Sequence, residues 1–266
     1  MVYRLAVGIS VLLMVGVAEG CHTWEPDADT RDLVLPFVGA VPYPPAGLQS
    51  TCPQERLSLL VAITKTPAMS GYNGDHVQRA VTRLNRALSN SRLNWSVEVT
   101  TRINVQDPDD SASMKDIHTE LESGGGRWAY LLQPRQADLF AIAVGGRPKD
   151  YHGVARIAAG PNTAVTVIHA DQAFDDKAIG LAHEFGHLAG IRHQDDPEEI
   201  PDRQGHAYAT KLNRTVTGAP GPRSLFFSHP PDHGTEDWSN AVAVMQKTLP
   251  YLAGFHCESM AEAAAP

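Results

Sequence analysis

Three histidines and one glutamate are concentrated in the eleven-residue stretch HEFGHLAGIRH, which runs from position 183 to 193. Four residues along an α-helix return to the same face, so His183 and His187 can direct their imidazoles at one ion. Glu184 is offset by about 100° around the helix and can reach a water bound to that ion. Gly190 can take a left-handed conformation at no steric cost, end the helix and return the chain so that His193 supplies a third ligand. Three histidines with a fourth position open to water are typical of catalytic zinc, so we expect one Zn²⁺.

The remaining polar clusters offer weaker patterns. His206, His229, His233 and His256 stand without ligand spacing, and we expect them to be solvated or hydrogen-bonded. The acidic run at 195–199 is typical of a solvated loop, and no calcium-loop pattern supports metal binding there. No local motif favours nucleophilic Ser/His/Asp or Cys/His chemistry.

The first twenty residues resemble a removable signal peptide. Arg4 precedes an apolar run at 5–17, and a small-x-small sequence follows at 18–20, so residues 1–20 are expected to be cleaved in an exported protein. The run is too short to span a bilayer comfortably, and no transmembrane segment follows it. The net charge of −8 argues against nucleic acid as a partner. About 245 remaining residues suffice for one large or two small domains, and we expect a monomer.

The cysteine count of three is odd, and an exported chain meets oxidising conditions. Cys21 directly follows the cleavage site, where a lipoprotein carries its acylated cysteine, although Glu19 is a poor residue before such a site. Lipidation of Cys21 would leave Cys52 and Cys257 as a disulfide between the two ends of the domain. The alternative is simple secretion with one free or intermolecular cysteine.

Periodicity divides the rest of the chain. Residues 21–55 are rich in proline and acidic residues without a period, which indicates an extended lead-in. Buried or alternating strands are expected at 57–64, 95–105, 137–144, 151–157 and 163–168. Helices are expected at 75–88, with Asp75 as a possible N-cap, and around 114–121, where the glycines at 124–126 end the helix. A third helix is expected from near Lys177 through the histidine motif, and a fourth at 236–249, before Pro250.

This order of elements predicts an α/β (α+β) fold with a mixed, twisted sheet. We expect a catalytic domain over residues 56–257, in which a helix carries the histidines and a smaller, loop-rich C-terminal subdomain follows. Residues 258–266 are expected to form a flexible tail.

The motif His183-Glu184-x-x-His187-x-x-Gly190-x-x-His193 resembles the long zinc signature of the metzincin metallopeptidases. The stretches LVAITKTPA, YHGVARI, RSLFFSHP and NAVAVMQKTLPYLAGF resemble, in order, segments of the bacterial reprolysin-like branch that includes peptidyl-Asp metalloendopeptidases. The resemblance implies an extended substrate that pairs with the strand around 153–157, which is expected to be a sheet edge. Gly153, Val154 and Ala155 would then bind substrate backbone.

Three positions depart from the family pattern. Metzincins carry a methionine on a turn beneath the zinc, and the matching stretch RTVTG has Thr217 there. Met245 is at helical spacing with its neighbours and is expected in the core. His152 replaces a cysteine, and Gln194 stands where many relatives have aspartate.

The sequence therefore predicts a secreted zinc endopeptidase that acts on a peptide or protein substrate. Glu184 would take the proton from a zinc-bound water as that water attacks the scissile carbonyl. The rival hypotheses are an inactive relative that keeps zinc, suggested by Thr217, and a lipid-anchored surface binding protein, suggested by Cys21.

Overall fold

The computed structural model describes residues 33–35, 55–105, 112–124, 137–145, 152–160, 163–175, 178–194, 205–208, 215–218 and 224–255. The expected signal peptide, the tail at 258–266 and all three cysteines (Cys21, Cys52 and Cys257) lie outside these ranges, so the cleavage, lipidation and disulfide hypotheses remain predictions. Within the ranges, no helix is long and apolar enough to cross a membrane.

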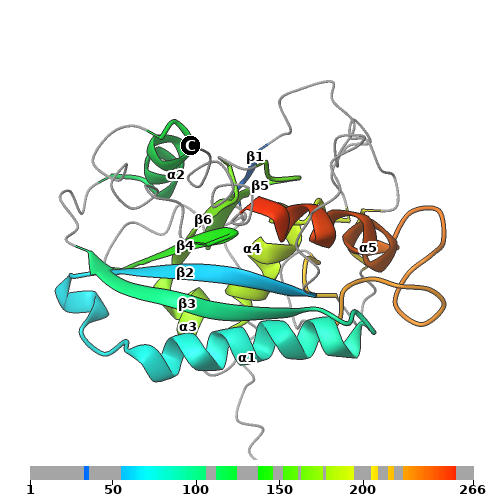
Figure 1. Cartoon of the computed structure of the whole chain (residues 1–266), viewed down its shortest axis with the longest axis horizontal. Coiled ribbons are helices and arrows are strands. Elements are labelled where there is room, and N and C mark those ends of the chain that lie inside the picture. The colour runs from blue at the N-terminus through cyan, green and yellow to red at the C-terminus, as the bar shows by residue number, and fades with distance from the viewer. Residues whose placement is uncertain are drawn as a thin grey trace, which may run out of the picture.

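A mixed sheet of six strands organises the fold (Figure 1), and its order is β1-β5-β6-β4-β2-β3. The strands are β1 (Leu33–Leu35), β2 (Arg56–Thr64), β3 (Ser96–Val105), β4 (Leu139–Val144), β5 (Gly153–Arg156) and β6 (Val165–His169). β5 is antiparallel to β6 and parallel to β1, whereas the other neighbours pair in parallel. The predicted α/β class is confirmed, and the expected strands from 57 onward correspond to β2 to β6. β1 was not predicted, because a three-residue strand in a proline-rich segment has no detectable period.

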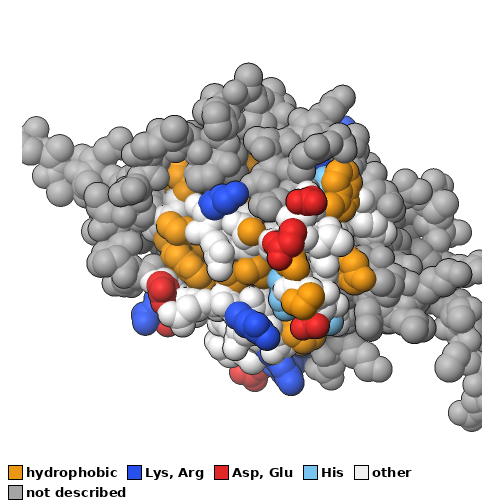
Figure 2. Space-filling view, turned by 90° about the vertical axis from the view of Figure 1, so that its right-hand side faces the viewer, with side chains coloured by type: hydrophobic (Ala, Val, Ile, Leu, Met, Phe, Trp, Pro, Cys, Tyr) orange, Lys and Arg blue, Asp and Glu red, His pale blue; other side chains and the backbone are white. Residues whose placement is uncertain are grey.

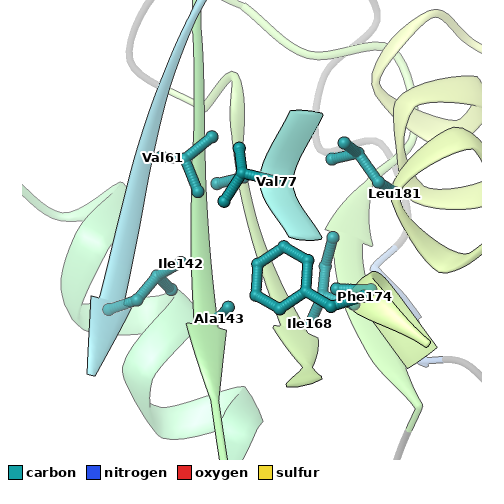
Figure 3. A pocket seen from close by; sticks show the side chains of 9 residues that line it. Val61, Val77, Ile142, Ala143, Ile168, Phe174 and Leu181 are labelled. Carbon is teal, nitrogen blue, oxygen red and sulfur yellow. The ribbon is translucent and has the colours of Figure 1, made fainter. Parts of the chain in front are cut away.

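Helices cover both faces of this sheet. One face packs on α1 (Gly74–Asn90), α3 (Ala170–Phe174) and α4 (Gly180–Leu188), and the other on α2 (Met114–Glu122). The last helix, α5 (Ala241–Leu252), joins the core of the first face. Alternation along β2 divides its side chains, because Leu59 and Val61 join the first core while Leu60 and Ala62 join the second. Figure 3 shows the first core from close by, where Val61, Val77, Phe174 and Leu181 line a small apolar pocket between the sheet and its helices.

Two helices begin at residues other than those expected. Asn73, and not Asp75, is the N-cap of α1, since its side-chain oxygen accepts from the backbone N–H groups of Asp75 and His76. Asp75 lies in the first turn, where its charge suits the positive end of the helix. The motif helix α4 begins at Gly180, and the short α3, which was not predicted, precedes it.

The last helix, α5, begins and ends later than expected. Asn240 caps its start by accepting a hydrogen bond from the N–H of Ala243. Pro250 was expected to stop the helix, but α5 continues to Leu252. A proline so close to the end removes one backbone donor from the last turn, and the buried side chains of Leu249 and Leu252 still pack on the core.

Candidate metal centre

The two histidines on α4 lie in the predicted arrangement. His183 and His187 are 1% and 0% exposed, and their Nε2 atoms are 3.0 Å apart. Their backbones are one helical turn apart, so both rings project from the same face of the helix. Both ring planes are held by the protein interior, because eight of the nine residues of this helix, all except Gly180, are buried.

A Schellman motif ends α4 and returns the chain to the site. Gly190 has a φ of +92°, and its N–H donates to the carbonyl of His187 at 2.8 Å. The N–H of Ile191 donates to the carbonyl of Gly186, also at 2.8 Å. The reversal places His193 Nε2 at 3.2 Å from His183 Nε2. The expected left-handed conformation of Gly190 is therefore present.

Backbone carbonyls determine which ring nitrogens carry hydrogen. His183 Nδ1 lies 2.9 Å from the carbonyl oxygen of Val216, and His187 Nδ1 lies 2.7 Å from that of Ile191. A carbonyl oxygen only accepts, so Nδ1 must be the donor in both rings, and in a neutral imidazole the Nε2 atom then carries a lone pair. Two such lone pairs 3.0 Å apart repel each other unless a cation lies between them.

The separations of the ring nitrogens fit a metal ion. Bonds of about 2.0–2.1 Å in a tetrahedral zinc site put its nitrogen ligands about 3.3 Å apart, close to the 3.0 Å and 3.2 Å found here. Ligand atoms of all three histidines lie within 4.8 Å of one another. In the described part of the chain this is the one group of three or more His, Cys, Asp or Glu residues that could hold a metal ion.

The turn at residues 215–218 lies against the helix that carries the histidines. Gly218 N–H donates to the carbonyl of Thr215 at 2.9 Å, which closes the turn, and Val216 supplies the carbonyl that orients His183. Thr217 is fully buried, and its Cγ2 is 2.4 Å from where a β-carbon on Gly186 would lie. Met245 lies instead in α5, fully buried in the core.

The hydroxyl of Thr217 is a polar atom in an apolar setting. Its Oγ1 is buried and has no hydrogen-bond partner within the described part of the chain. Another buried threonine nearby differs in this respect, because Thr248 Oγ1 donates to the carbonyl of Ala189 at 2.9 Å and ties α5 to the end of α4. The hydroxyl of Thr217 therefore carries a desolvation cost that the hydroxyl of Thr248 does not.

Glu184 faces strand β5. Its side chain is buried, with the residue 1% exposed, and its carboxylate lies against the α-carbon of Gly153. The segment after β5 is fastened to the end of α4, because the N–H groups of Ala158 and Ala159 donate to the carbonyls of His187 and Leu188 at 3.0 Å each. The structure thus brings the expected strand, Gly153 to Ala155, beside the expected general base.

The expectation that this strand is a sheet edge is wrong. β1 pairs with β5 in the register Leu33 to Val154, Val34 to Ala155 and Leu35 to Arg156. Three residues of the lead-in therefore occupy the position that was assigned to the backbone of a substrate. A single sequence cannot show this, because pairing between segments about 120 residues apart leaves no local pattern.

Ion pairing holds the far face of β5 to α2. Arg156 contacts the two carboxylate oxygens of Glu122 at 2.5 Å and 2.6 Å, and hydrogen bonding to Glu122 raises the pKa of Arg156. His118 is fully buried beside them, with Nε2 3.1 Å from the carbonyl oxygen of Val165. Burial lowers the pKa of His118, which favours the neutral ring. β5 is therefore anchored on both of its faces.

The other described histidines do not join the site. His206 is fully buried rather than solvated, and its ring stacks on Trp238 with centroids 3.8 Å apart. His229 and His233 exchange backbone hydrogen bonds, and their rings pack near Phe226. Figure 2 shows one face of the molecule, where exposed histidine atoms lie beside apolar and acidic side chains.

Comparison with known proteins gives a likeness of fold. No family model and no curated protein matches the chain. A structure described as a chaperone–substrate complex is similar with a TM-score of 0.62 and 16% identity over 75% of this chain. This chain spans about a third of that neighbour, 35% of its length.

Two structures of mirolysin from Tannerella forsythia are also similar. A promirolysin mutant has a TM-score of 0.47 and 14% identity, covering 78% of this chain and 84% of the other. Mature mirolysin in complex with a cleaved peptide has a TM-score of 0.41 and 16% identity, covering 77% and 89%. At these identities the likeness concerns the fold, and the chemistry has to be argued from the site itself.

Replacing the hydroxyl of Thr217 by a methyl group should stabilise the protein. Thr217→Val removes a buried hydroxyl that has no partner, and we expect the free energy of unfolding to rise by about 1 kcal/mol. The matched control is Thr248→Val, which removes a hydroxyl that donates to Ala189 and should lower that free energy by a similar amount. Urea unfolding of both variants measures the difference, and a loss of stability in Thr217→Val would show that its hydroxyl has a partner.

The left-handed residue after α4 should matter for the metal as well as for the fold. Gly190→Ala places a side chain at a φ of +92°, which costs about 1–2 kcal/mol, and relaxation of the turn should move His193 and weaken metal retention. Gly124→Ala is the control, because Gly124 has a φ of +61° with no atom within 4 Å of an added β-carbon and lies after α2. Competition with a chelator should separate the two variants, and equal metal retention would contradict the role given to Gly190.

Proposed function

We propose that this chain is a secreted zinc-dependent endopeptidase of the metzincin type. The observation that carries the proposal is the convergence of three imidazole nitrogens, with His183 Nε2 at 3.0 Å and 3.2 Å from the Nε2 atoms of His187 and His193, two of them on a helix that also carries the buried carboxylate of Glu184. A structural metal site would have no use for a buried carboxylate on the helix that carries its ligands. The pairing of ligands with a base favours hydrolysis.

The donor set supports zinc as the ion. His183, His187 and His193 would hold it, because neutral imidazoles suit zinc and three protein ligands are the catalytic pattern. When bound in such a site, zinc lowers the pKa of a water to about 7 and polarises the carbonyl to be attacked. The carbonyls of Val216 and Ile191 hold two of the rings in the orientation that this requires.

Glu184 is the proposed general base. Its carboxylate would accept the proton of the attacking water and then donate it to the leaving amine, so that the same oxygen atoms serve both steps. Burial under β5 keeps bulk water from this carboxylate and strengthens its interaction with the reacting groups.

The substrate is proposed to bind in extended form beside β5, on Gly153, Val154 and Ala155. β1 holds that position with only three residues in register. Each backbone hydrogen bond in such a ladder contributes about 0.5–1.5 kcal/mol net, so a longer peptide that also contacts the site can displace it.

The remaining parts of the proposal come from the sequence. Residues 1–20 would direct export, residues 56–257 would form the peptidase domain, and the protein would act outside the cytoplasm as a monomer. Acylation at Cys21 would make it a lipid-anchored form of the same enzyme, and Cys52 and Cys257 would then pair.

The competing function is a weakly active or inactive metzincin relative that acts as a surface-anchored binding protein. Thr217 favours it, because the buried hydroxyl replaces the apolar methionine side chain that the family places beneath the metal. The retained carboxylate of Glu184 speaks against it. Zinc content and chelator-sensitive peptide cleavage by the purified chain separate the two functions.

Removing the proposed base should abolish turnover and leave the metal. Glu184→Gln keeps the shape of the side chain but cannot accept a proton, so kcat should fall by at least about 10²–10⁴-fold with one zinc retained. Glu98→Gln makes the same change at an exposed carboxylate on β3 that pairs with Arg56, and its kcat should stay unchanged. Assays with zinc-loaded protein and metal analysis provide both readouts, and near-normal cleavage by Glu184→Gln would refute the mechanism.

Weakening β1 should make substrate binding easier. The double variant Val34→Pro with Leu35→Pro removes two consecutive backbone donors, of which at least one faces β5, because the N–H groups of a strand alternate in direction. If β1 is paired nine-tenths of the time, KM for an extended peptide should fall by about tenfold at constant kcat.

The matched control is Val34→Ala with Leu35→Ala, which keeps every backbone donor of β1. Steady-state kinetics on both double variants decides the matter. An unchanged KM in the proline variant would show that substrate does not compete with β1 for the strand.

A further inference from the structure

Gly153 is in unusually close contact with Glu184. A β-carbon added to Gly153 would lie 2.1 Å from Glu184 Oε1, 2.5 Å from Cδ and 2.9 Å from Cγ. The carboxyl group and the methylene before it therefore occupy the space that any side chain at position 153 would need.

The backbone of β5 does not itself require a glycine at this position. Among the described glycines, only Gly124 and Gly190 have a positive φ, so Gly153 has backbone angles that an alanine can adopt. Glycine within a strand weakens it and often marks a close approach by another group. The contact with Glu184 is such an approach.

Neither side of this contact can retreat without a cost elsewhere. Strand β5 is hydrogen-bonded to β1 and β6, and Arg156 fastens it to Glu122 on the opposite face. α4 is held by the N–H groups of Ala158 and Ala159 and by the hydroxyl of Thr248. The distance between Gly153 and the backbone of Glu184 is therefore fixed by the fold, and only the Glu184 side chain is able to move.

We infer that Gly153 is a positioning residue, whose missing side chain sets where the carboxylate of Glu184 lies relative to the three imidazoles. It acts through Glu184 and touches no metal ligand in this role. The inference rests on the proposed function for its catalytic consequence, and the contact itself can be tested without activity.

The first experiment adds one methyl group. Gly153→Ala should keep zinc and lower kcat by about 10–100-fold, because a displacement of about 1 Å in a catalytic group has an effect of that size, with KM changed by less than about twofold. Gly160→Ala is the matched control, since its added β-carbon would meet only Thr163 Oγ1 at 3.7 Å, and its kcat should equal that of the unchanged protein. Equal kcat values for Gly153→Ala and the unchanged protein would overturn the inference.

The second experiment tests whether the methyl group acts through Glu184. Glu184→Asp shortens the side chain by one methylene and leaves room for a β-carbon on Gly153. Adding Gly153→Ala to Glu184→Asp should therefore lower kcat by less than about twofold beyond Glu184→Asp alone. A full additional 10–100-fold loss would show that Gly153→Ala damages something other than the position of the carboxylate.

The third experiment uses the metal-free protein and no substrate. Gly153→Ala should lower the melting temperature by about 2–4 °C, and the decrease should vanish in a Glu184→Ala background, where the colliding atoms are absent. A decrease of the same size in both backgrounds would overturn the contact. If the unchanged zinc-loaded chain cleaves no peptide, the proposed function fails, while this thermal cycle still decides whether Gly153 positions Glu184.

Discussion

Two hydrogen bonds from imidazoles to backbone carbonyls control the site. By donating Nδ1–H to the carbonyls of Val216 and Ile191, His183 and His187 commit their Nε2 lone pairs to the same small volume. Both carbonyls come from tight reversals of the chain, one in the turn at 215–218 and one just after the end of α4. The arrangement of these ring nitrogens, which could hold a metal ion, is thus set by the conformation of the backbone. Substitutions of the histidine side chains alone cannot reproduce it.

Strand β5 connects this geometry to the rest of the fold. It is one of two strands that run against the direction of the others, and it lies between β1 and β6. One of its faces meets Glu184 and the other is paired through Arg156 to Glu122. The four residues of β5 contact the rest of the sheet, the helix that carries the histidines, and α2. Strain introduced in β5 would therefore displace the carboxylate of Glu184.

Much of this arrangement could be predicted because its causes are local in sequence. The spacing of His183 and His187, and the glycine at 190, determine a shared helix face and a reversal whatever surrounds them. Short apolar runs identified β2 and β4, because a strand buried on both faces is apolar throughout, whereas alternation identified β3, which alternates between buried and exposed side chains. The cap of α1 was assigned two residues too late, because Asn73 and Asp75 are equally good caps in sequence. β1 left no signal. The backbone carbonyls of Val216 and Ile191 could not be predicted as partners of the histidines, because every residue type has a carbonyl. The contact of Gly153 with Glu184 joins segments that only the folded chain brings together. The isolated glycine in YHGVARI was the one sequence feature that could have indicated a close approach.

The short pairing of β1 with β5 has a consequence for the solution behaviour of shortened chains. A chain that began at residue 56 would retain every other strand of the sheet but would leave the outer side of β5 with unpaired N–H and C=O groups. Exposed edges of this kind add strands from other molecules, which leads to aggregation. The three residues of β1 would then act as a protective cover for β5, and a shortened chain that avoids this aggregation would have to begin before Leu33 rather than at β2.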